Sequence, residues 1–375
     1  MKIVHIISGL KIGGAEQALL RLIIGSNKLE FNHIVISLSG EGELCQLFIN
    51  ANIDLRIINF KKKPVSSFFV LIKIIAQTKP DIVQTWLYHA DLIGGITAKI
   101  AGVKHIIWGI RTTDLKKGSY STALVRKINA WLSFSLPSKI VCVAESAKAR
   151  HVKLGYCESK MLIIPNGFDL DKLHKYIIDS AQLRLKHGIK QNEIVIGSMG
   201  RFSQIKGQDV FVKAAKIVAE NNPNVRFLMV GRELQESNKP LMKWITNTGF
   251  VDRFVLLGER LDVNICFGAM NIFCLHSRSE GFPNVLGEAM AMGLPCVATD
   301  VGDAKILGGE LVKIVEPDNP EVLALALMQM LNFQSKKLNE LGKLSNKRIF
   351  HMYSLSTMQL AYQGLYNNIL LKKSH

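Results

Sequence analysis

The chain has 375 residues, of which 48% are hydrophobic and 21% charged, and its formal net charge at pH 7 is +17. This is the composition of a globular protein with enough apolar residues for two domains, and it excludes a largely disordered chain. The charge is uneven, because residues 1–165 hold 22 Lys/Arg against 10 Asp/Glu, whereas residues 166–375 hold 25 against 20. A basic first half favours an anionic partner: nucleic acid, a phosphate-bearing substrate or an anionic lipid surface. The alternative is that the charge reflects a generally basic composition or serves solubility, without a specific anionic partner.

Cysteine spacing and hydropathy indicate in which cellular compartment the protein works. The six cysteines form no C-x-x-C pair, which favours reduced core residues over disulfides or a zinc site. The opening stretch MKIVHIISGL is too short and too interrupted for a signal peptide. No run of about 18 apolar residues occurs, so we expect no membrane-spanning helix. These features together predict a cytoplasmic protein.

Apolar runs alternate with helical patterns along the first half of the chain. Buried strands that alternate with helices are typical of a parallel sheet with both faces covered. The runs expected as strands are KIVHII (2–7), HIVISL (33–38), DLRIINF (54–60), DIVQTW (81–86), HIIWGI (105–110), KIVCVA (139–144) and MLIIP (161–165).

The same pattern restarts in the second half, after a cluster of turn residues at 164–173. Two successive sets of parallel strands predict two Rossmann-like domains, with ligands at the carboxyl ends of the strands and a site in the cleft between the domains. The second set is EIVIGSMG (193–200), RFLMVG (226–231), FVLLG (254–258), NIFCLHS (271–277), PCVATD (295–300) and VKIVE (312–316).

The stretch HSRSEGFPNVLGEAMAMGLP, residues 276–295, carries two glutamates eight positions apart, Glu280 and Glu288. Pro283 suits the start of a helix after an expected strand, and the closing Gly-x-Pro suits its end. Glu288 lies more than one turn inside that helix, and helical side chains lean toward the amino end, so both carboxylates can face one site. The residues alone leave open an acid–base pair, a metal site or a ligand clamp.

Two other loops suit a phosphate. In GRFSQIKGQD, residues 200–209, Arg201 and Lys206 are cations flanked by glycines at the end of a strand, which suits a diphosphate. In SGLKIGGAEQ, Gly13 and Gly14 stand between a strand and a helix, where backbone can approach a ligand closely. Neither loop is a Walker A or a G-x-G-x-x-G motif.

Two further candidates follow strands of the first half. His89 in WLYHADL stands where ligand-facing residues occur in open sheets, although a lone histidine is more often structural, and Arg111 in IRTTDLKK ends a strand and is followed by basic residues. The only D-x-D is Asp169-Leu170-Asp171 in the expected interdomain turn, so we expect no bound metal. The charge of a diphosphate would then have to be met by the cations of the 200–209 loop and by helix amino termini.

These segments together resemble the family-four retaining glycosyltransferases, which have the two-domain GT-B fold. The resemblance spans the whole chain and rests on GGAE, WLYHADLIGGITAKIAGV, VAESAKARHVKLGY, IPNGFD, GRFSQIKGQDVFVKAA, EGFPNVLGEAMAMGLPCVATDVG and MYSLSTMQLAYQGLY, in that order. It implies an α/β chain with two Rossmann-like domains facing a central cleft. Residues 1–165 would bind the acceptor and residues 166–354 the nucleotide sugar. A helix at about 355–375 would cross back to the first domain.

The resemblance also implies roles for the residues of the second domain. Arg201 and Lys206 would hold the donor's diphosphate, Glu280 would contact hydroxyls of the transferred sugar, and Glu288 would bind the ribose hydroxyls. Backbone at the helix start would meet sugar and phosphate, at Gly281, Phe282, Pro283, Asn284 and Val285.

In the first domain, the resemblance places Gly13 and Gly14 near the diphosphate and the acceptor, and His89 beside the transferred sugar. The implied catalytic set is therefore His89, Arg201, Lys206 and Glu280. The loop GRELQESNKP, residues 231–240, departs from the GDG ending usual at this strand, so residues that contact the base are not assigned.

The implied activity is the transfer of a hexose or N-acetylhexosamine from a nucleotide diphosphate sugar, with a UDP-sugar favoured and GDP-mannose second. The acceptor would be a glycan or a polyprenyl-diphosphate-linked sugar in surface polysaccharide synthesis, with no cofactor, no metal and no nucleic acid partner. The basic stretch before SSFFVLIKII and the segment RKINAWLSFSLPSK would allow peripheral contact with an anionic inner membrane face. Ordinary core helices with solvated lysines are the alternative.

Three other functions compete. A glycoside hydrolase could use the two glutamates at about 5 to 9.5 Å separation, but it has no need of the cation loop. A two-domain nucleotide-sugar epimerase would need carboxylates and histidines suited to reversible elimination, and no clear set is present. A basic nucleic-acid-binding protein would interleave its cations with aromatic residues, which this chain does not do.

Overall fold

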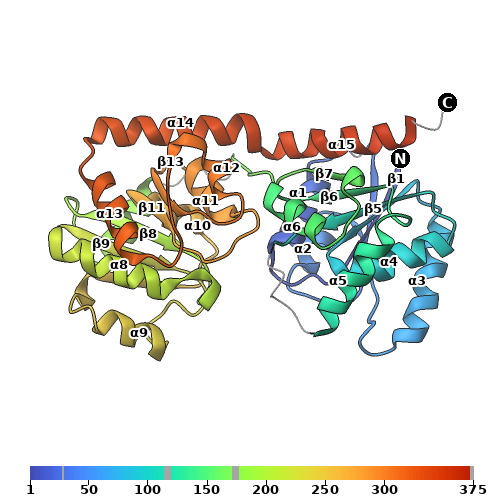
Figure 1. Cartoon of the computed structure of the whole chain (residues 1–375), viewed down its shortest axis with the longest axis horizontal. Coiled ribbons are helices and arrows are strands. Elements are labelled where there is room, and N and C mark those ends of the chain that lie inside the picture. The colour runs from blue at the N-terminus through green and yellow to red at the C-terminus, as the bar shows by residue number, and fades with distance from the viewer. Residues whose placement is uncertain (28, 114–119, 171–176, 372–375) are drawn as a thin grey trace. The chain divides into compact units, whose positions relative to one another are not determined.

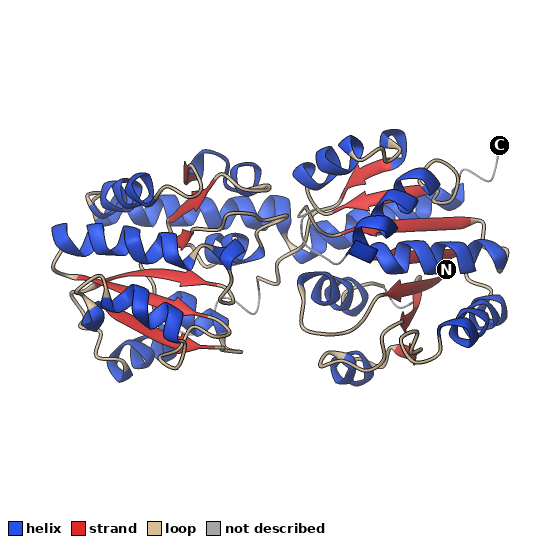
Figure 2. Ribbon diagram, turned by 60° about the horizontal axis from the view of Figure 1, so that its bottom comes forward, coloured by secondary structure: helices blue, strands red, loops and turns tan. Residues whose placement is uncertain are grey.

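The computed structural model describes residues 1–27, 29–113, 120–170 and 177–371. It divides the chain into two compact units, Met1–Gly167 with Leu355–His375, and Phe168–Ser354. The sequence analysis placed the boundary after residue 165, two residues before the division that the structure shows, and the return at about residue 355. Each unit is a parallel sheet with helices on both faces (Figures 1 and 2).

Within the described residues, the first unit has a seven-stranded sheet in the order β3-β2-β1-β4-β5-β6-β7. Every neighbouring pair is parallel, and in the central strands nearly every side chain is buried, which explains their Val- and Ile-rich sequences. The strands are β1 Lys2–Ile7, β2 Asn32–Ser37, β3 Asp54–Ile57, β4 Ile82–Trp86, β5 His105–Ile110, β6 Lys139–Cys142 and β7 Met161–Ile163. Each of the seven strands expected from the sequence is present.

The helices of the first unit fill the connections between its strands. They are α1 Gly14–Ile24, α2 Cys45–Asn50, α3 Pro64–Thr78, α4 Tyr88–Ile100, α5 Tyr120–Leu132, α6 Glu145–Lys153 and the 3₁₀ turn η1 Glu158–Lys160. Among the described residues, no helix of the chain is both long and apolar enough to cross a bilayer.

The helix α15, Leu355–Leu371, belongs to the first unit although it follows the whole second unit in the chain (Figure 1). Its buried residues recur at helical spacing, at Met358, Tyr362, Leu365, Tyr366 and Ile369. They join the same core as residues of β1 and β4. Full burial of each large side chain contributes on the order of 1.5–3 kcal/mol, so this helix is a structural part of the first unit. This confirms the return predicted for it.

The second unit has, in its described residues, a six-stranded parallel sheet in the order β10-β9-β8-β11-β12-β13. All six strands expected from the sequence are present, and the two sheets confirm the predicted α/β class with two Rossmann-like units. The strands are β8 Ile194–Met199, β9 Val225–Val230, β10 Phe254–Gly258, β11 Ile272–Leu275, β12 Cys296–Thr299 and β13 Val312–Val315.

Helices again connect these strands. The two described residues that join the units, Phe168 and Ser354, form a parallel bridge, and the Phe168 N–H donates to Tyr353 O at 2.9 Å. The helices are α7 Ile177–Lys186, η2 Gln204–Lys206, α8 Gln208–Asn221, α9 Lys239–Thr246, η3 Val251–Arg253, α10 Val263–Gly268, α11 Asn284–Ala291, α12 Ala304–Gly308, η4 Gly309–Leu311, α13 Pro320–Leu331 and α14 Ser335–Tyr353.

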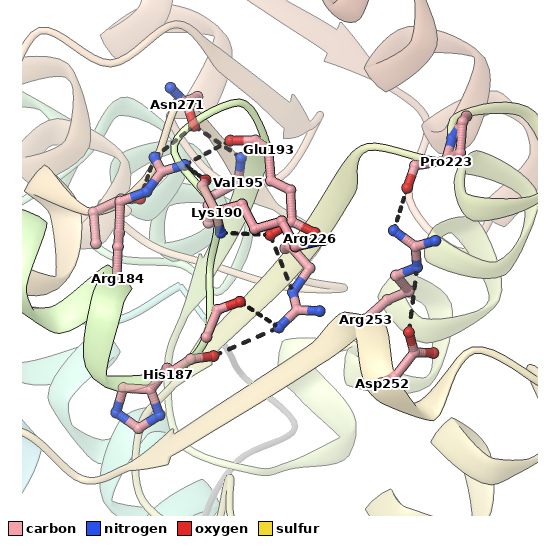
Figure 3. A network of polar contacts seen from close by, with 12 residues as sticks. Arg184, His187, Lys190, Glu193, Val195, Pro223, Arg226, Asp252, Arg253 and Asn271 are labelled. Atoms are coloured by element: carbon pink, nitrogen blue, oxygen red, sulfur yellow. Dashed lines mark hydrogen bonds and ion pairs between the residues drawn. The ribbon is translucent and has the colours of Figure 1, made fainter.

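At the amino ends of the strands of the second unit, charged side chains form a polar network (Figure 3). Arg184 of α7 donates to Ala269 O at 3.4 Å, to Lys190 O at 3.2 Å, to Glu193 O at 2.5 Å and to Asn271 Oδ1 at 3.1 Å. The Glu193 carboxylate accepts from the Lys190 N–H at 2.7 Å. Because most of these acceptors are backbone carbonyls, the network ties α7 to the loops that enter β8 and β11.

A second part of the network lies at the entries to β9 and β10. Arg226 on β9 pairs with Glu193 at 4.0 Å and donates to His187 O and Gly188 O, both at 3.5 Å. Arg253, just before β10, donates to Pro223 O and pairs with Asp252 at 3.6 Å. This end of the sheet is therefore held by side chains that close loops onto strands.

Candidate functional site

The strand orders place the candidate residues of each unit at a single position. In both sheets the order reverses direction between two central strands, β1 and β4 in the first unit and β8 and β11 in the second. Ligands of open parallel sheets bind outside the carboxyl ends of the strands at such a reversal. Gly13 follows β1 and His89 follows β4, while Lys206 follows β8 and Glu280 follows β11. The sequence motifs thus coincide with the two positions that the topology favours for binding.

In the second unit, the structure brings Lys206 and Glu280 together. The Lys206 ammonium donates to Glu280 Oε1 at 2.6 Å, and the side chains are 21% and 12% exposed. The Ser277 hydroxyl donates to the same carboxylate oxygen at 2.6 Å. A partly buried charge-assisted pair of this kind holds both groups in fixed positions. The predicted diphosphate cation and the predicted sugar carboxylate are therefore neighbours.

The loop that carries Lys206 is held by backbone geometry. Gly207 has a φ of +69°, and a Cβ at this position would lie 2.3 Å from His276 O, so neither the conformation nor the space admits a side chain. The ring of His276 donates from Nδ1 to Lys206 O at 2.6 Å and accepts at Nε2 from the Ser198 hydroxyl. Burial lowers the pKa of His276 to about 4, so the ring is neutral at pH 7.

The turn before Lys206 is held by Gln208, which is buried at the start of α8. Its amide donates to Arg201 O at 2.9 Å and accepts from the Ser203 N–H at 3.3 Å. The Arg201 side chain is exposed, and within the described part of the chain it has no hydrogen-bond or ion-pair partner. Arg201 is therefore a cation that an anionic ligand can engage without breaking an existing pair.

The loop after Glu280 leads into α11 through Pro283, the residue at the amino cap, whose own side chain makes no cap hydrogen bond. Gly302, with a φ of +56°, passes this loop so closely that a Cβ would lie 2.3 Å from Gly281 O. The Phe282 ring stacks on Phe168 with centroids 6.0 Å apart. These two contacts hold the loop that enters α11. The backbone N–H groups of its first turn can then face an anion with the positive end of the helix dipole.

Glu288 lies within α11 and is partly buried, and the remaining predicted residues, Asn284 and Val285, form its first turn. In sequence Glu280 precedes this first turn and Glu288 follows it, so the α11 amino terminus stands between the two glutamates along the chain. This order is consistent with a clamp in which each carboxylate meets a different part of one ligand.

In the first unit, Gly13 is the amino cap of α1, and the Glu16 carboxylate folds back over it: a Cβ on Gly13 would lie 2.3 Å from Glu16 Oε2. Burial raises the pKa of Glu16, and the nearby Arg111 guanidinium opposes that rise. Gly14 begins the helix and is exposed. The loop thus presents bare backbone with one partly buried carboxylate beside it.

His89 lies in the first turn of α4, and burial lowers the pKa of its ring. The turn that carries it is strained, because Leu87 has a φ of +76°, which is unusual for a residue with a branched side chain. The Leu87 N–H donates to Gly109 O at 3.1 Å, which anchors the turn to β5. Such strain is often found at functional positions, and it costs about 1–3 kcal/mol.

Arg111, a candidate from its position after an expected strand, has several partners within the first unit. Its guanidinium lies over the Trp86 ring at 5.1 Å from the centroid and donates to Tyr362 of α15 at 3.5 Å and to Asn166. It therefore joins β5, α15 and the segment after β7, which is a structural role. The basic residues that follow it, Lys116 and Lys117, lie outside the described residues.

A metal site was not expected from the sequence. In the residues that the structure describes, no group of three or more His, Cys, Asp or Glu side chains converges. Asp171 of the D-x-D sequence lies outside the described residues. The described cysteines are buried and free, as expected for reduced core residues.

Two family models match the chain. One, described as "Glycosyltransferase Family 4", matches residues 12–172, and one described as "Glycosyl transferases group 1" matches residues 179–348. Among similar proteins, the UDP-Gal:alpha-D-GlcNAc-diphosphoundecaprenol alpha-1,3-galactosyltransferase of Escherichia coli is 28% identical over 83% of this chain and 81% of its own length. The capsular polysaccharide biosynthesis glycosyltransferase CapM of Staphylococcus aureus is 25% identical over 82% and 81%.

Solved structures share the fold over nearly the whole chain. Anabaena Alr3699/HepE, crystallised in complex with UDP-glucose, has a TM-score of 0.85 at 21% identity, and the match covers 98% of this chain and 100% of the other. A glycosyltransferase from Rickettsia africae ESF-5 has a TM-score of 0.85 at 20% identity and covers 98% of both chains.

Proposed function

We propose a reaction for this chain, which belongs to the glycosyltransferases that join a family 4 domain to a group 1 domain and has their GT-B fold. It transfers a hexose or N-acetylhexosamine from a nucleotide diphosphate sugar to a glycan or polyprenyl-diphosphate-linked acceptor. The names of the relatives support polysaccharide or lipid-linked glycan synthesis. The match to glycosyltransferase models favours this function over the hydrolase, epimerase and nucleic-acid-binding alternatives.

The observation that carries the proposal is the Lys206–Glu280 pair at the strand reversal of the second unit, with the unpaired Arg201 beside it in sequence. Without a ligand, Lys206 neutralises Glu280. A diphosphate competes for the ammonium, and the released carboxylate becomes an acceptor for sugar hydroxyls. Donor binding therefore exchanges one internal ion pair for two ligand contacts, which limits the cost of desolvating either charge.

Charge develops on the leaving diphosphate during transfer, and Arg201, Lys206 and the amino terminus of α11 are the groups positioned to stabilise it. Glu288 binds the ribose hydroxyls. We propose that no metal is needed, because two cations and a helix amino terminus stand at this strand end and can meet the charge of the diphosphate. The first unit supplies the acceptor through Gly13, Gly14 and His89.

We further propose that the anomeric configuration is retained. Glu280, the carboxylate predicted beside the transferred sugar, would then accept from sugar hydroxyls and from the Ser277 hydroxyl, and we assign it no role as a nucleophile. The acceptor hydroxyl then attacks from the face that the diphosphate leaves, and the leaving phosphate oxygen takes its proton. UDP-sugars are the favoured donors and GDP-mannose the second choice, because two similar proteins carry UDP-linked names.

The test is a transfer assay with UDP-galactose, UDP-glucose, UDP-N-acetylglucosamine and GDP-mannose, each with a polyprenyl-diphosphate-linked sugar and with EDTA present. We expect turnover with at least one UDP-sugar in EDTA and an α-linked product by NMR. Silence with every donor, with and without the lipid acceptor, would contradict the transferase proposal. Turnover that requires added Mg²⁺ would contradict only the metal-independent part.

We also propose that the first unit touches an anionic membrane face from the cytoplasmic side. On α5, Leu124, Ile128 and Trp131 recur on one side of the helix and are exposed, and Phe134 follows them. On α3, Val65 and Phe69 are exposed one turn apart, next to three consecutive lysines at 61–63. Helices α3 and α5 both pack on α4 (Figure 1). Apolar stripes beside lysines suit insertion at an anionic lipid interface.

Sedimentation with phosphatidylglycerol vesicles tests this surface. The variant Trp131→Ser/Phe134→Ser should lose most of the binding, whereas Leu185→Ser in α7 should not, since Leu185 and Trp131 are both 76% exposed. Added salt should weaken binding because part of the attraction is electrostatic. Equal binding of both variants would contradict the assignment of this face.

A further inference from the structure

Arg278 lies in the loop that carries Glu280 and bonds to the loop that carries Lys206. It stands three residues after the end of β11, and its backbone N–H donates to Ile205 O at 2.7 Å. Its guanidinium reaches the same loop a second time, through a bond from Nη1 to Gln204 O at 2.7 Å. One residue therefore connects to two successive carbonyls next to Lys206, while it stands two positions before Glu280.

Two carboxylates hold the Arg278 guanidinium in this orientation. Asp209, in the first turn of α8, accepts two parallel bonds from Nη1 and Nη2 at 2.8 and 2.7 Å. Asp318, which precedes α13, accepts from Nε. The hydrogen bonds with Asp209 raise the pKa of Arg278, and the same pairing lowers the pKa of Asp209. Bidentate pairing fixes the plane of the guanidinium as well as its position.

We propose that Arg278 is a positioning residue that sets the register between the Lys206 loop and the Glu280 loop. Resting on the proposed function, it thereby sets the spacing between the diphosphate contact and the sugar contact of one donor molecule. The sequence motif alone does not indicate this role, because Asp209 and Arg278 are 69 residues apart and meet only through the order of β8 and β11.

The two carboxylates that hold Arg278 pair with it with different strengths. The pair with Asp209 is bidentate, and the Asp209 side chain is 27% exposed. The Asp318 side chain is 57% exposed and accepts a single bond. Exposed pairs contribute little because solvent screens them. Removing Asp209 should therefore reproduce most of the effect of removing Arg278, and removing Asp318 should not.

The test compares Arg278→Gln, Arg278→Lys, Asp209→Asn and Asp318→Asn with Arg253→Gln. The control is matched, because the Arg253 and Arg278 side chains are 25% and 24% exposed and lie at opposite ends of one sheet. The readouts are kcat and KM for the active UDP-sugar, the dissociation constant of UDP by calorimetry, and Tm.

For Arg278→Gln we expect kcat/KM to fall by about tenfold to a hundredfold, because small misplacement of positioned groups costs on this scale. The loss should lie mainly in kcat, while the UDP dissociation constant changes less, since UDP lacks the sugar that Glu280 must meet. Asp209→Asn should lower kcat by a similar factor, and the kcat of Arg278→Lys should lie between those of Arg278→Gln and the unmodified protein. Asp318→Asn and Arg253→Gln should keep the kcat of the unmodified protein.

A double variant separates positioning from general stability. If Arg278 acts by placing Lys206, then Lys206→Ala/Arg278→Gln should be no slower than Lys206→Ala alone. Multiplying losses, or a kcat for Arg278→Gln equal to that of Arg253→Gln, would overturn the positioning role while leaving the transferase intact. Should the unmodified protein bind no UDP and transfer no sugar, both proposals fall together.

Discussion

At the two ends of the sheet in the second unit, cationic side chains have different kinds of partner. At the amino end, Arg184 donates to three backbone carbonyls and to Asn271, so its guanidinium is occupied by the fold (Figure 3). At the carboxyl end, Lys206 holds only a carboxylate and Arg201 holds nothing among the described residues. A cation bonded to carbonyls serves stability, whereas a cation paired with a movable carboxylate can change partner when a ligand arrives.

The largest expected effect tests the carboxyl end. Lys206→Ala should lower kcat/KM by about a hundredfold to a thousandfold, the scale for removing one preorganised group that stabilises developing charge. Its Tm should change little, because Glu280 keeps the Ser277 hydroxyl. Steady-state kinetics and differential scanning calorimetry measure the two quantities. A large fall in Tm with unchanged kinetics would erase the contrast between the two ends.

The converse is expected of Arg184→Ala at the amino end. It leaves several carbonyls without their donor, and we expect a loss of about 1–3 kcal/mol in the free energy of unfolding. Turnover per folded molecule at low temperature should be unchanged. Urea unfolding and active-site titration provide the check, with Arg232→Ala, whose pair with Glu259 is exposed, as a stability control. A loss of kcat as large as that of Lys206→Ala would show that the two ends are coupled.

The smallest effect is a difference in response to acid. The pKa of His276 is about 4 in the folded chain, below its ordinary value near 6.5, because burial disfavours the charged ring. The neutral ring therefore stabilises the fold fully above about pH 6.5, and this contribution is lost as pH falls toward 4. The His276 bonds hold the Lys206 loop, whereas the bonds of Arg184 to backbone carbonyls, which do not titrate in this range, hold the amino end.

Hydrogen exchange at pH 7 and pH 5 should detect this. Protection of residues 200–207 should fall at pH 5 while that of residues 190–196 is kept, and His276→Gln should remove the pH dependence of the first segment. Equal loss at both ends would mean that the histidine does not set the local stability. The pKa of His33 and of His151 is also about 4, so some general loss of stability in the first unit is expected as well.

Sequence reasoning found the strands and the loop ends because both are local properties. A run such as KIVHII predicts a buried strand by itself, and glycines beside Arg201 and Lys206 mark a loop by themselves. The order of the strands is not local, so the meeting of Lys206 with Glu280 followed only from the family resemblance. The assigned roles in donor binding and catalysis stay predictions.

Residues that bond across loops were missed for the same reason. Gln208, His276 and Arg278 each hold a segment that is distant in sequence or turned back on itself. The feature that marks Gln208 and His276 is burial of a polar side chain next to a motif, and a single sequence does not reveal burial. Arg111 also shows what a single sequence leaves out, since its place after β5 indicates nothing of its contacts with Trp86 and Tyr362.

The placement of α15 has a consequence for biosynthesis. The core of the first unit needs Tyr362 and Tyr366, yet these residues are translated after all of Phe168–Ser354. On the ribosome, the second unit can complete its fold as a continuous segment, while the first waits, with β1 and β4 only partly covered. The unit that begins first would then be the last to finish, which reverses the usual vectorial order of domain folding. A nascent chain that stops before residue 355 should leave an apolar surface for chaperones to bind.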